Sequence, residues 1–372
     1  MVTYNTASHF DDTDDVLIIL RKIFLDFGYS RVAKMFSTFC ICFYSVAYLL
    51  EIYFIITHFN KNLVLKYFPE ILMFTYLIIN MIVLIFLEKP FLKMQKSVFA
   101  TARKINSAGE RAKAIILKKS STIMSYNFFA IGLFIFCSII LFPMWSYDYD
   151  EILLCPHVLE AFFGNWSKIP YFLYFAGIPF LNFFCMKFSC ILLYYASHIQ
   201  MQIFLLSEHI TQISKDFDCV NEWNKIHSVL YQNEMYRRLS FCIQWHVELR
   251  RSLRIFLTTV NSVMGIFVVL GTLYCASTTF FILYNIEILN IISKVRVLFV
   301  ASCSVVMVIM FCESGQKLVN ETGRIFDTLL LCPWYIWNPK IRQSFLLFLT
   351  NSVRPIQFSF AGITLNRLFI IT

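Results

Sequence analysis

The side chains that could carry out chemistry are spread thinly along this chain. Its seven histidines are scattered and lack metal-ligand spacing. The sequence has no glycine-rich phosphate loop, no Cys-x-x-Cys pair and no His-Glu-x-x-His motif. Glu51 and Glu70 lie in or near apolar runs, where an ionisable group is costly and often functional. Glu70 is close enough to an end of its run to reach water, whereas for Glu51 a packing role and a functional role both stay open. No acid–base pair or nucleophile can be assembled, so we expect no enzyme, no cofactor and no metal centre.

The composition places the chain in a membrane. Of its 372 residues, 58% are apolar and 15% are charged, and the mean hydropathy is +0.66. A soluble domain keeps roughly 25% charged residues to cover its surface, so much of this surface must face lipid. The net charge of +9 comes from basic residues between the apolar runs. We interpret them as topology signals rather than as a nucleic-acid patch, and expect membrane lipid, not nucleic acid, as a partner.

The apolar runs predict an all-α membrane protein with seven transmembrane helices. Six runs reach or approach the length that crosses about 30 Å of hydrocarbon as a helix. They cover residues 35–58, 64–86, 128–147, 169–196, 255–284 and 295–312. A seventh run begins near Phe345, is broken at Pro355 and resumes from Ile356 to the end. Residues 16–29 predict an amphipathic helix at the inner membrane surface before the first span.

The basic residues of the loops predict the orientation. The segments between spans two and three and between spans four and five are rich in Lys and Arg, whereas the alternating loops carry Lys61 and Lys168. By the positive-inside rule, the N-terminus is cytoplasmic and the C-terminus is outside, the reverse of a G-protein-coupled receptor. The glycosylation sequon at Asn165 then falls in an outer loop, where it can be used, and the one at Asn320 falls inside.

Helical periodicity continues outside the spans and predicts a cytoplasmic helical anchor. Spans four, five and six extend into the cytoplasm, and a further helix starts at Pro339, a residue favoured in the first turn. An aromatic cluster, Trp334, Tyr335 and Trp337, precedes that helix; an interfacial aromatic belt is the alternative interpretation. The expected organisation is an N-terminal segment, spans one to four, cytoplasmic extensions, spans five and six, anchor helices and the start of the last span. Their bounds are 1–34, 35–197, 198–254, 255–312, 313–355 and 356–372.

The C-terminal part resembles the signature of insect odorant receptors. In that family a Trp-Tyr precedes a basic helix, which ends in an Arg-Pro or Lys-Pro break before the last span. The matching stretches here are Trp-Tyr-Ile-Trp-Asn-Pro-Lys-Ile-Arg at 334–342, Ser-Val-Arg-Pro at 352–355, Ala-Gly at 361–362 and Glu-Ser at 313–314. The Thr-Tyr…Gln-Phe pattern of gustatory relatives and an Asp-Arg-Tyr after span three are missing. A gustatory-type or G-protein-coupled chemosensory receptor is therefore the alternative.

The resemblance implies an odorant receptor subunit in the plasma membrane of olfactory sensory neurons. Members of that family form odorant-gated, non-selective cation channels, as heterotetramers with a shared coreceptor, and detect small volatile lipophilic molecules. It implies subunit-anchor roles for Trp334, Tyr335, Arg342 and Pro355. It implies a pore along the last span, at Ser359, Gly362 and Asn366. Family members continue past the position of Thr372, so we expect residues 356–372 to be a truncated span.

The resemblance also implies a ligand site in the outer half of the membrane, between spans two, three, four and six. Helical spacing then gives its candidate residues, which are Phe68, Ile71, Leu72, Thr75, Phe136, Ile140, Trp145, Tyr174, Ile178, Leu181, Phe299 and Ser302. Micromolar affinity needs about 8 kcal/mol, which dispersion and desolvation can nearly supply to a ligand of about ten atoms. In a chain with 41 Phe, any of these side chains can instead face lipid.

Overall fold

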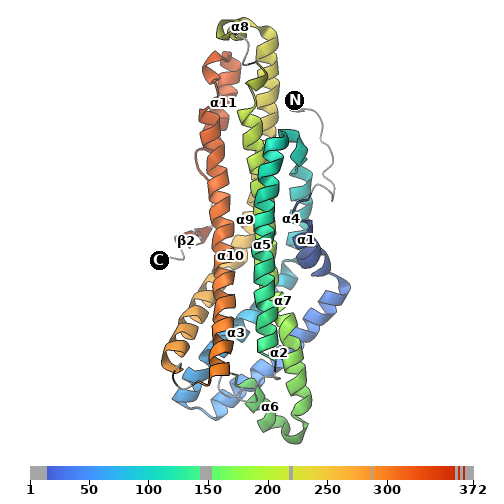
Figure 1. Cartoon of the computed structure of the whole chain (residues 1–372), viewed down its shortest axis with the longest axis vertical. Coiled ribbons are helices and arrows are strands. Elements are labelled where there is room, and N and C mark those ends of the chain that lie inside the picture. The colour runs from blue at the N-terminus through green and yellow to red at the C-terminus, as the bar shows by residue number, and fades with distance from the viewer. Residues whose placement is uncertain are drawn as a thin grey trace.

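The computed structural model describes residues 15–142, 153–217, 221–285, 287, 289–356, 359–360 and 363–364, which form an elongated helical bundle (Figure 1). Within these residues, six helices are long and apolar enough to cross a membrane. They are α2 Arg31–Thr57, α3 Lys61–Phe86, α5 Glu110–Ile140, α7 Lys168–Thr211, α9 Val229–Asn285 and α10 Ile291–Leu330. Helix α6 Cys155–Phe163 lies at the bottom of Figure 1, and α8 Glu222–His227 and α11 Pro339–Ser352 lie at the top. We call these the α6 end and the α11 end.

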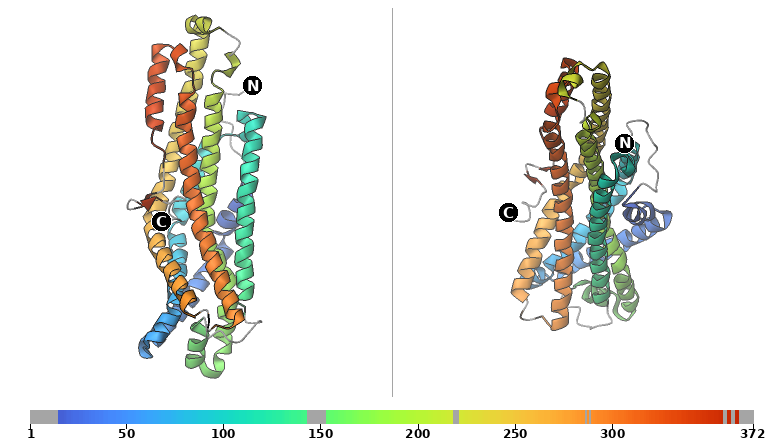
Figure 2. Two further views of the ribbon diagram at one scale, coloured as in Figure 1. Left: turned by 60° about the vertical axis from the view of Figure 1, so that its left-hand side comes forward. Right: turned by 45° about the horizontal axis from the view of Figure 1, so that its top comes forward.

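Helix α7 is the central element of the bundle. All its residues from 186 to 207 are buried, although this stretch includes Lys187, His198 and Gln200. A helix that is buried on every side must be surrounded by other helices, and α10, α5, α9 and α3 pack around it. Figure 2 shows α7, α9 and α10 running side by side along the bundle. The helical extensions of spans four, five and six are present, because α7 and α10 continue well past their apolar runs and α9 begins well before its run.

The segment between the second and third apolar runs is helical rather than an open loop. It contains α4 Glu88–Thr101 and the first half of α5, which starts after Gly109 at a φ of 91°. Lys119, on this part of α5, forms a 2.5 Å ion pair with the mostly buried Glu321 of α10. Basic residues of this segment therefore hold helices together, besides contributing the charge from which the orientation was predicted.

The N-terminal helix is docked into the bundle. It consists of α1 Ile18–Leu20 and a seven-residue π-helix, Arg21–Phe27. Asp15 and Arg21 are buried, and the Asp15 carboxylate accepts a 2.9 Å hydrogen bond from the Tyr194 hydroxyl and pairs with Arg21 at 3.4 Å. Buried charges persist where they are paired and hydrogen-bonded. The helix predicted at 16–29 is thus present, but it packs against α7 rather than only covering a membrane surface.

A compact polar and aromatic core holds the α11 end together. The Gln232 side chain of α9 donates to the Ile336 carbonyl at 3.0 Å and accepts from the Asn338 N–H at 2.9 Å. Asn338 caps α11 by accepting from the Ile341 N–H at 2.9 Å. Trp337 is 1% exposed and packs edge-on against Phe345, with ring centroids 5.4 Å apart. These contacts fold α11 back against α9 and α10.

The described residues after α11 differ from the helix predicted to start at Ile356. Ser359–Phe360 (β1) and Ile363–Thr364 (β2) form a two-residue antiparallel pair. A short helix is stable mainly where it can pack an apolar face against neighbours, and these residues make a strand ladder instead. Of the predicted pore residues, Ser359 lies in β1, while Gly362 and Asn366 lie outside the described residues.

Candidate functional site

A cavity of about 480 Å³ lies between five helices in the half of the bundle nearest the α6 end. This volume is in the range of sites that bind small organic molecules. Its walls come from α3, α5, α7, α9 and α10, and Leu153 covers it from the segment before α6. Typical lining residues are Phe74, Leu77, Phe134, Ile178, Phe267 and Val300.

Few polar groups face this cavity. Tyr76, Tyr174 and Tyr274 contribute phenol side chains, and Asn182 contributes an amide that donates to the Ser138 hydroxyl at 2.7 Å. Among the described residues that line the cavity, none carries a charge. An ion would lose its hydration there without gaining a partner, so the cavity suits a neutral lipophile with one or two hydrogen-bonding groups.

Sulfur is enriched in the lining. Five of the chain's 12 cysteines line the cavity: Cys137, Cys185, Cys275, Cys303 and Cys312. Three methionines join them: Met73, Met264 and Met307. Sulfur side chains are polarisable, and methionine is flexible as well, so such a wall adapts to ligands of different shape. From the sequence these cysteines could be interpreted only as small packing residues.

Three of the 12 residues predicted for the ligand site line this cavity, and all three are on α7: Tyr174, Ile178 and Leu181. On the other helices the lining face is rotated by one residue from the predicted face. Cys137 of α5 and Leu141 directly after it line the cavity rather than Phe136 and Ile140, and α10 presents Val300 and Cys303 rather than Phe299 and Ser302. One residue corresponds to about 100° around a helix. Because these helices are apolar on all sides, the sequence does not fix their rotation.

The displaced residues have other contacts. Thr75 exchanges a 2.8 Å hydrogen bond with Tyr48 of α2, and Phe136 and Phe299 pack against each other with centroids 5.1 Å apart. The Ile140 carbonyl accepts from Arg296, and the Ser302 hydroxyl donates to the Leu298 carbonyl. Phe68 is exposed, Leu72 is half-buried, and Ile71 packs in a small cluster with Tyr67 and Leu154. Trp145 lies outside the described residues.

Helix α9 contributes a wall that the predicted site did not include. Met264, Phe267, Gly271, Thr272 and Cys275 face the cavity. Their spacing of three and four residues is that of one helix face. Small and polar residues within an otherwise bulky apolar span were the signal that could have identified this face.

The two membrane-embedded carboxylates belong to the α6 end rather than to the cavity wall. Glu70 is buried, so it does not reach water, contrary to the expectation from the sequence. Its carboxylate accepts a 2.6 Å hydrogen bond from the Leu154 N–H. Glu51 is buried as well. A carboxylate in front of a helix N-terminus is favourably placed, so Glu70 holds α6 across the bundle end. Among the described residues, no cluster of His, Cys, Asp and Glu could hold a metal ion.

The predicted anchor residues gather at the α11 end. Trp334 and Tyr335 are 43% and 53% exposed, and the Tyr335 hydroxyl donates to Glu222 at 3.1 Å. Arg342 donates to the Trp337 carbonyl at 2.5 Å. Pro355 is exposed just after α11. The buried anchor of this end within one subunit is therefore Trp337, which leaves Trp334 and Tyr335 on the surface.

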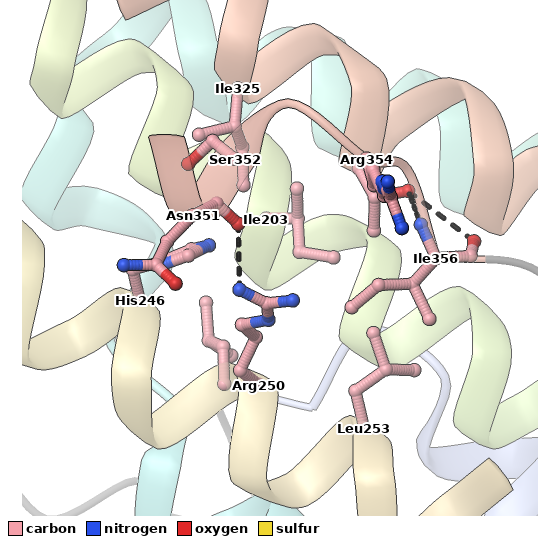
Figure 3. A pocket seen from close by; sticks show the side chains of 11 residues that line it. Ile203, His246, Arg250, Leu253, Ile325, Asn351, Ser352, Arg354 and Ile356 are labelled. Carbon is pink, nitrogen blue, oxygen red and sulfur yellow. Dashed lines mark hydrogen bonds between the residues drawn. The ribbon is translucent and has the colours of Figure 1, made fainter. Parts of the chain in front are cut away.

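A joint connects α9, α10 and α11 to the segment that follows them (Figure 3). The Arg250 guanidinium donates to the Asn351 carbonyl at 2.6 Å, and the His246 ring lies 4.9 Å from the Phe348 ring. The small cavity here has a volume of about 20 Å³, enough for one water molecule. The joint is consequently a mechanical contact rather than a ligand site.

Comparisons with known proteins agree with this architecture. The model of the 7tm odorant receptor family matches residues 60–371. No curated protein matches this sequence. The structure is similar to that of the insect olfactory receptor OR5 from Machilis hrabei, with a TM-score of 0.70 and 13% identity, over 97% of this chain and 96% of that chain. The structure of that receptor in complex with eugenol gives a TM-score of 0.65 and 13% identity, over 96% and 92% of the two chains. Because the family model covers most of its length, the chain belongs to the 7tm odorant receptor family.

Proposed function

We propose that this odorant receptor subunit binds a small neutral lipophile in the five-helix cavity and thereby opens a cation channel formed with a coreceptor. The observation that carries the proposal is the cavity itself, which is apolar and free of charge along its described lining. The similar Machilis hrabei receptor was solved in complex with eugenol, a small aromatic molecule with a few oxygen atoms. Tyr76, Tyr174, Tyr274 and Asn182 offer hydrogen bonds to a ligand of this class.

Helices that line the cavity also reach the joint, which gives the ligand a mechanical path to the pore. On α10, Cys312 faces the cavity, and Thr322 lies ten residues further, about 15 Å along the helix. On α9, Met264 faces the cavity and Arg250 binds α11. A ligand that prefers one arrangement of α9 against α10 shifts the population toward it, and the joint carries that change to the segment that leads to the proposed pore.

The proposed orientation places the N-terminus and the α11 end in the cytoplasm. The charge distribution of the loops supports it. A tag at the N-terminus should be inaccessible to antibody added outside intact cells. Asn165 lies in an exposed turn at the α6 end, so Asn165→Gln should remove any attached glycan. An N-terminal tag that is accessible from outside would reverse the orientation.

Assembly with a coreceptor is proposed through the α11 end. Its surface exposes Leu331, Trp334, Tyr335, Leu346 and Leu347. A cluster of large exposed apolar residues marks an interaction surface. Expressed alone, the subunit should give little odorant-evoked current, whereas coexpression with an insect coreceptor should give cation current within milliseconds. Second-messenger signalling without a coreceptor would contradict this assignment.

Two glycines provide a matched test of the ligand site. A Cβ added at Gly271, on the cavity wall, or at Gly132, on the exposed face of α5, meets no atom within 4 Å. Both positions therefore accept a larger residue, and leucine also favours the helix over glycine. We expect Gly271→Leu to raise the half-activating concentration of large odorants about tenfold, a loss of about 1.4 kcal/mol, and to spare small ones. Gly132→Leu should leave the half-activating concentrations of all odorants unchanged. Equal effects of the two variants would show that the ligand binds outside this cavity.

A further inference from the structure

A second apolar cavity lies against the first, on the outer face of the bundle. It has a volume of about 490 Å³ and is bounded by the π-helix Arg21–Phe27, α5 and α7. Ile23, Phe24, Ile131, Ile135, Ile139 and Phe183 are among its lining residues. Ile135 and Ile139 are 57% and 49% exposed. They lie on the apolar part of α5, so this cavity opens toward lipid rather than toward water.

Two residues line both cavities and so form the wall between them: Phe134 of α5 and Asn182 of α7. The Asn182 amide spans the seam between the two helices, donating to the Ser138 hydroxyl at 2.7 Å and to the Phe134 carbonyl at 3.4 Å. Pro179, one turn earlier on α7, also lines the outer cavity. A proline inside a helix removes one hydrogen bond from the ladder, so the α7 backbone is less constrained next to this wall.

The opposite approach, from water at the α6 end, is covered. Leu153 lies over the inner cavity, and Leu154, Cys155, Val158 and Leu159 around the start of α6 are buried. The Glu70 carboxylate holds this segment through the Leu154 N–H. Past the described residues of this end, an approach from water would have to displace Leu153 and the packed helix α6, whereas an approach from the outer cavity meets one amide and one aromatic ring.

We propose that the outer cavity is an antechamber through which a lipophile dissolved in the membrane reaches the ligand cavity, with Asn182 and Phe134 as the gate. The proposal rests on the proposed function, because it assigns a route to the same ligand site. Each added CH₂ favours hydrocarbon over water by about fourfold, so the bilayer is the larger reservoir for such ligands. As a ligand passes, its oxygen atom can accept the hydrogen bond that the Asn182 amide gives to Ser138. The amide then stays satisfied throughout.

A gate has a kinetic signature that distinguishes it from a binding site. A residue that only blocks the route changes the rates of association and dissociation by the same factor and leaves the equilibrium affinity unchanged. A residue that contacts the bound ligand changes the affinity. Ile135 lines only the outer cavity and Gly271 only the inner one, so substitutions at the two positions should separate the two effects.

The test measures binding of the fluorescent lipophile 1-aminoanthracene to the receptor complex in lipid nanodiscs by stopped flow. Ile135→Trp should slow association and dissociation about tenfold each, with an unchanged dissociation constant. Ser138→Ala removes the nearer of the two acceptors of the Asn182 amide, leaving the Phe134 carbonyl at 3.4 Å, and should accelerate both rates. Phe128→Trp is the matched control, because Phe128 is 51% exposed on the same helix and lies outside both cavities; its rates should equal those of the wild type.

Three results would overturn the antechamber. Unchanged rates in Ile135→Trp would place the route elsewhere. A changed dissociation constant in Ile135→Trp, with the Gly271→Leu constant unaltered, would make the outer cavity the resting site of the lipophile. Equal slowing by Phe128→Trp would show a general effect of bulk on α5. If only the proposed function were wrong, the result would differ from these three. The dye would still bind with the gated kinetics, but no odorant would evoke a current.

Discussion

The backbone N–H of Ile356 donates a 3.1 Å hydrogen bond to the hydroxyl oxygen of Thr322, which ties the chain after α11 to α10. Helix α10 also lines the five-helix cavity, so this bond joins a cavity helix to the segment that leads to the proposed pore. The Thr322 hydroxyl also donates to the Ile356 carbonyl at 3.4 Å, and the bond from Arg250 to Asn351 holds the other side of the joint.

Thr322→Val should alter gating without altering ligand binding. Valine keeps the shape of threonine but removes the hydroxyl, a loss of about 1 kcal/mol or about fivefold in the gating equilibrium. The maximal current relative to surface receptor should change, while the dissociation constant for a bound dye stays constant. Thr328→Val is the matched control, because the Thr328 hydroxyl bonds only to the Arg324 carbonyl within α10. A changed dissociation constant in Thr322→Val would mean that the joint is not separate from the site.

Alanine substitutions of the two tryptophans at the α11 end should have different effects, one on stability and the other on assembly. Trp337 is buried against Phe345, and removing a buried Trp typically costs about 3–5 kcal/mol. Trp337→Ala should therefore lower the melting temperature of the detergent-solubilised subunit. Trp334 is 43% exposed, so Trp334→Ala should leave that temperature almost unchanged and reduce copurification with a coreceptor. The reverse pattern would place Trp334 in the core of the subunit.

Acidification should loosen the joint through His246. This residue lies on α9 before its apolar span begins, and burial, followed by the nearby Arg250 charge, lowers its pKa to about 4. Its folded-state pKa is below the unfolded value, so the unfolded chain binds the proton more readily. The stability contribution is therefore complete above about pH 6.5 and is lost as the pH falls toward 4.

Thermal melting at pH 7.5 and pH 5 measures this effect. The wild type should lose several degrees between the two, and His246→Gln should lose less because it cannot take up the proton. The ring contact with Phe348 is altered at both pH values in the variant, so the difference between the two temperatures is the informative quantity. An identical pH dependence in wild type and variant would exclude His246 as the titrating group.

The sequence predicted the helices more reliably than their rotation. Apolar length located six spans, and polar periodicity located the extensions of α7, α9 and α10. Along the helices, the lining of the cavity lies near the residues predicted for the ligand site, since Cys137 and Val300 are one residue from Phe136 and Phe299. The cavity lining and the predicted residues differ in their rotation about the helix axes. In a water-soluble protein, the polar face of a helix shows which way the helix is rotated. Here both the side that faces lipid and the side that faces protein are apolar, so side-chain packing alone determines the rotation.

The polar interior of α7 was equally hard to foresee. His198, Gln200 and Gln202 lie in the predicted extension of span four, and all three are buried. Gln202 is satisfied by a partner distant in sequence: its side chain accepts from the Arg103 N–H at 2.8 Å and donates to the Arg103 carbonyl at 3.2 Å. A single sequence shows the polar residue but does not show the backbone that satisfies it.

Lys187 should prove essential for docking the N-terminal helix. Its ammonium group donates a 2.7 Å hydrogen bond to the Gly28 carbonyl and lies 3.4 Å from the centroid of the Tyr29 ring, although the side chain is almost fully buried. Hydrogen bonds to charged groups contribute about 1.5–3 kcal/mol, so Lys187→Met should lower the melting temperature and expose the N-terminal segment to protease. Lys34→Met is the control, because its ion pair with Glu88 is half-exposed and exposed pairs contribute about 0–1 kcal/mol.

Gly28→Ala provides an independent route to the same contact. A Cβ at this position would lie 2.3 Å from the Phe24 carbonyl oxygen and 2.9 Å from Cε of Lys187, so it should shift the end of the π-helix and displace the lysine while keeping its charge. Both variants should then release the N-terminal helix to a similar extent. Burying an ammonium group is itself costly, and replacing a buried charge with an apolar side chain of similar size is often neutral or stabilising. If Lys187→Met melts at or above the wild-type temperature while Gly28→Ala melts below it, the lysine is a net cost to folding, and the helix is held by its apolar face alone.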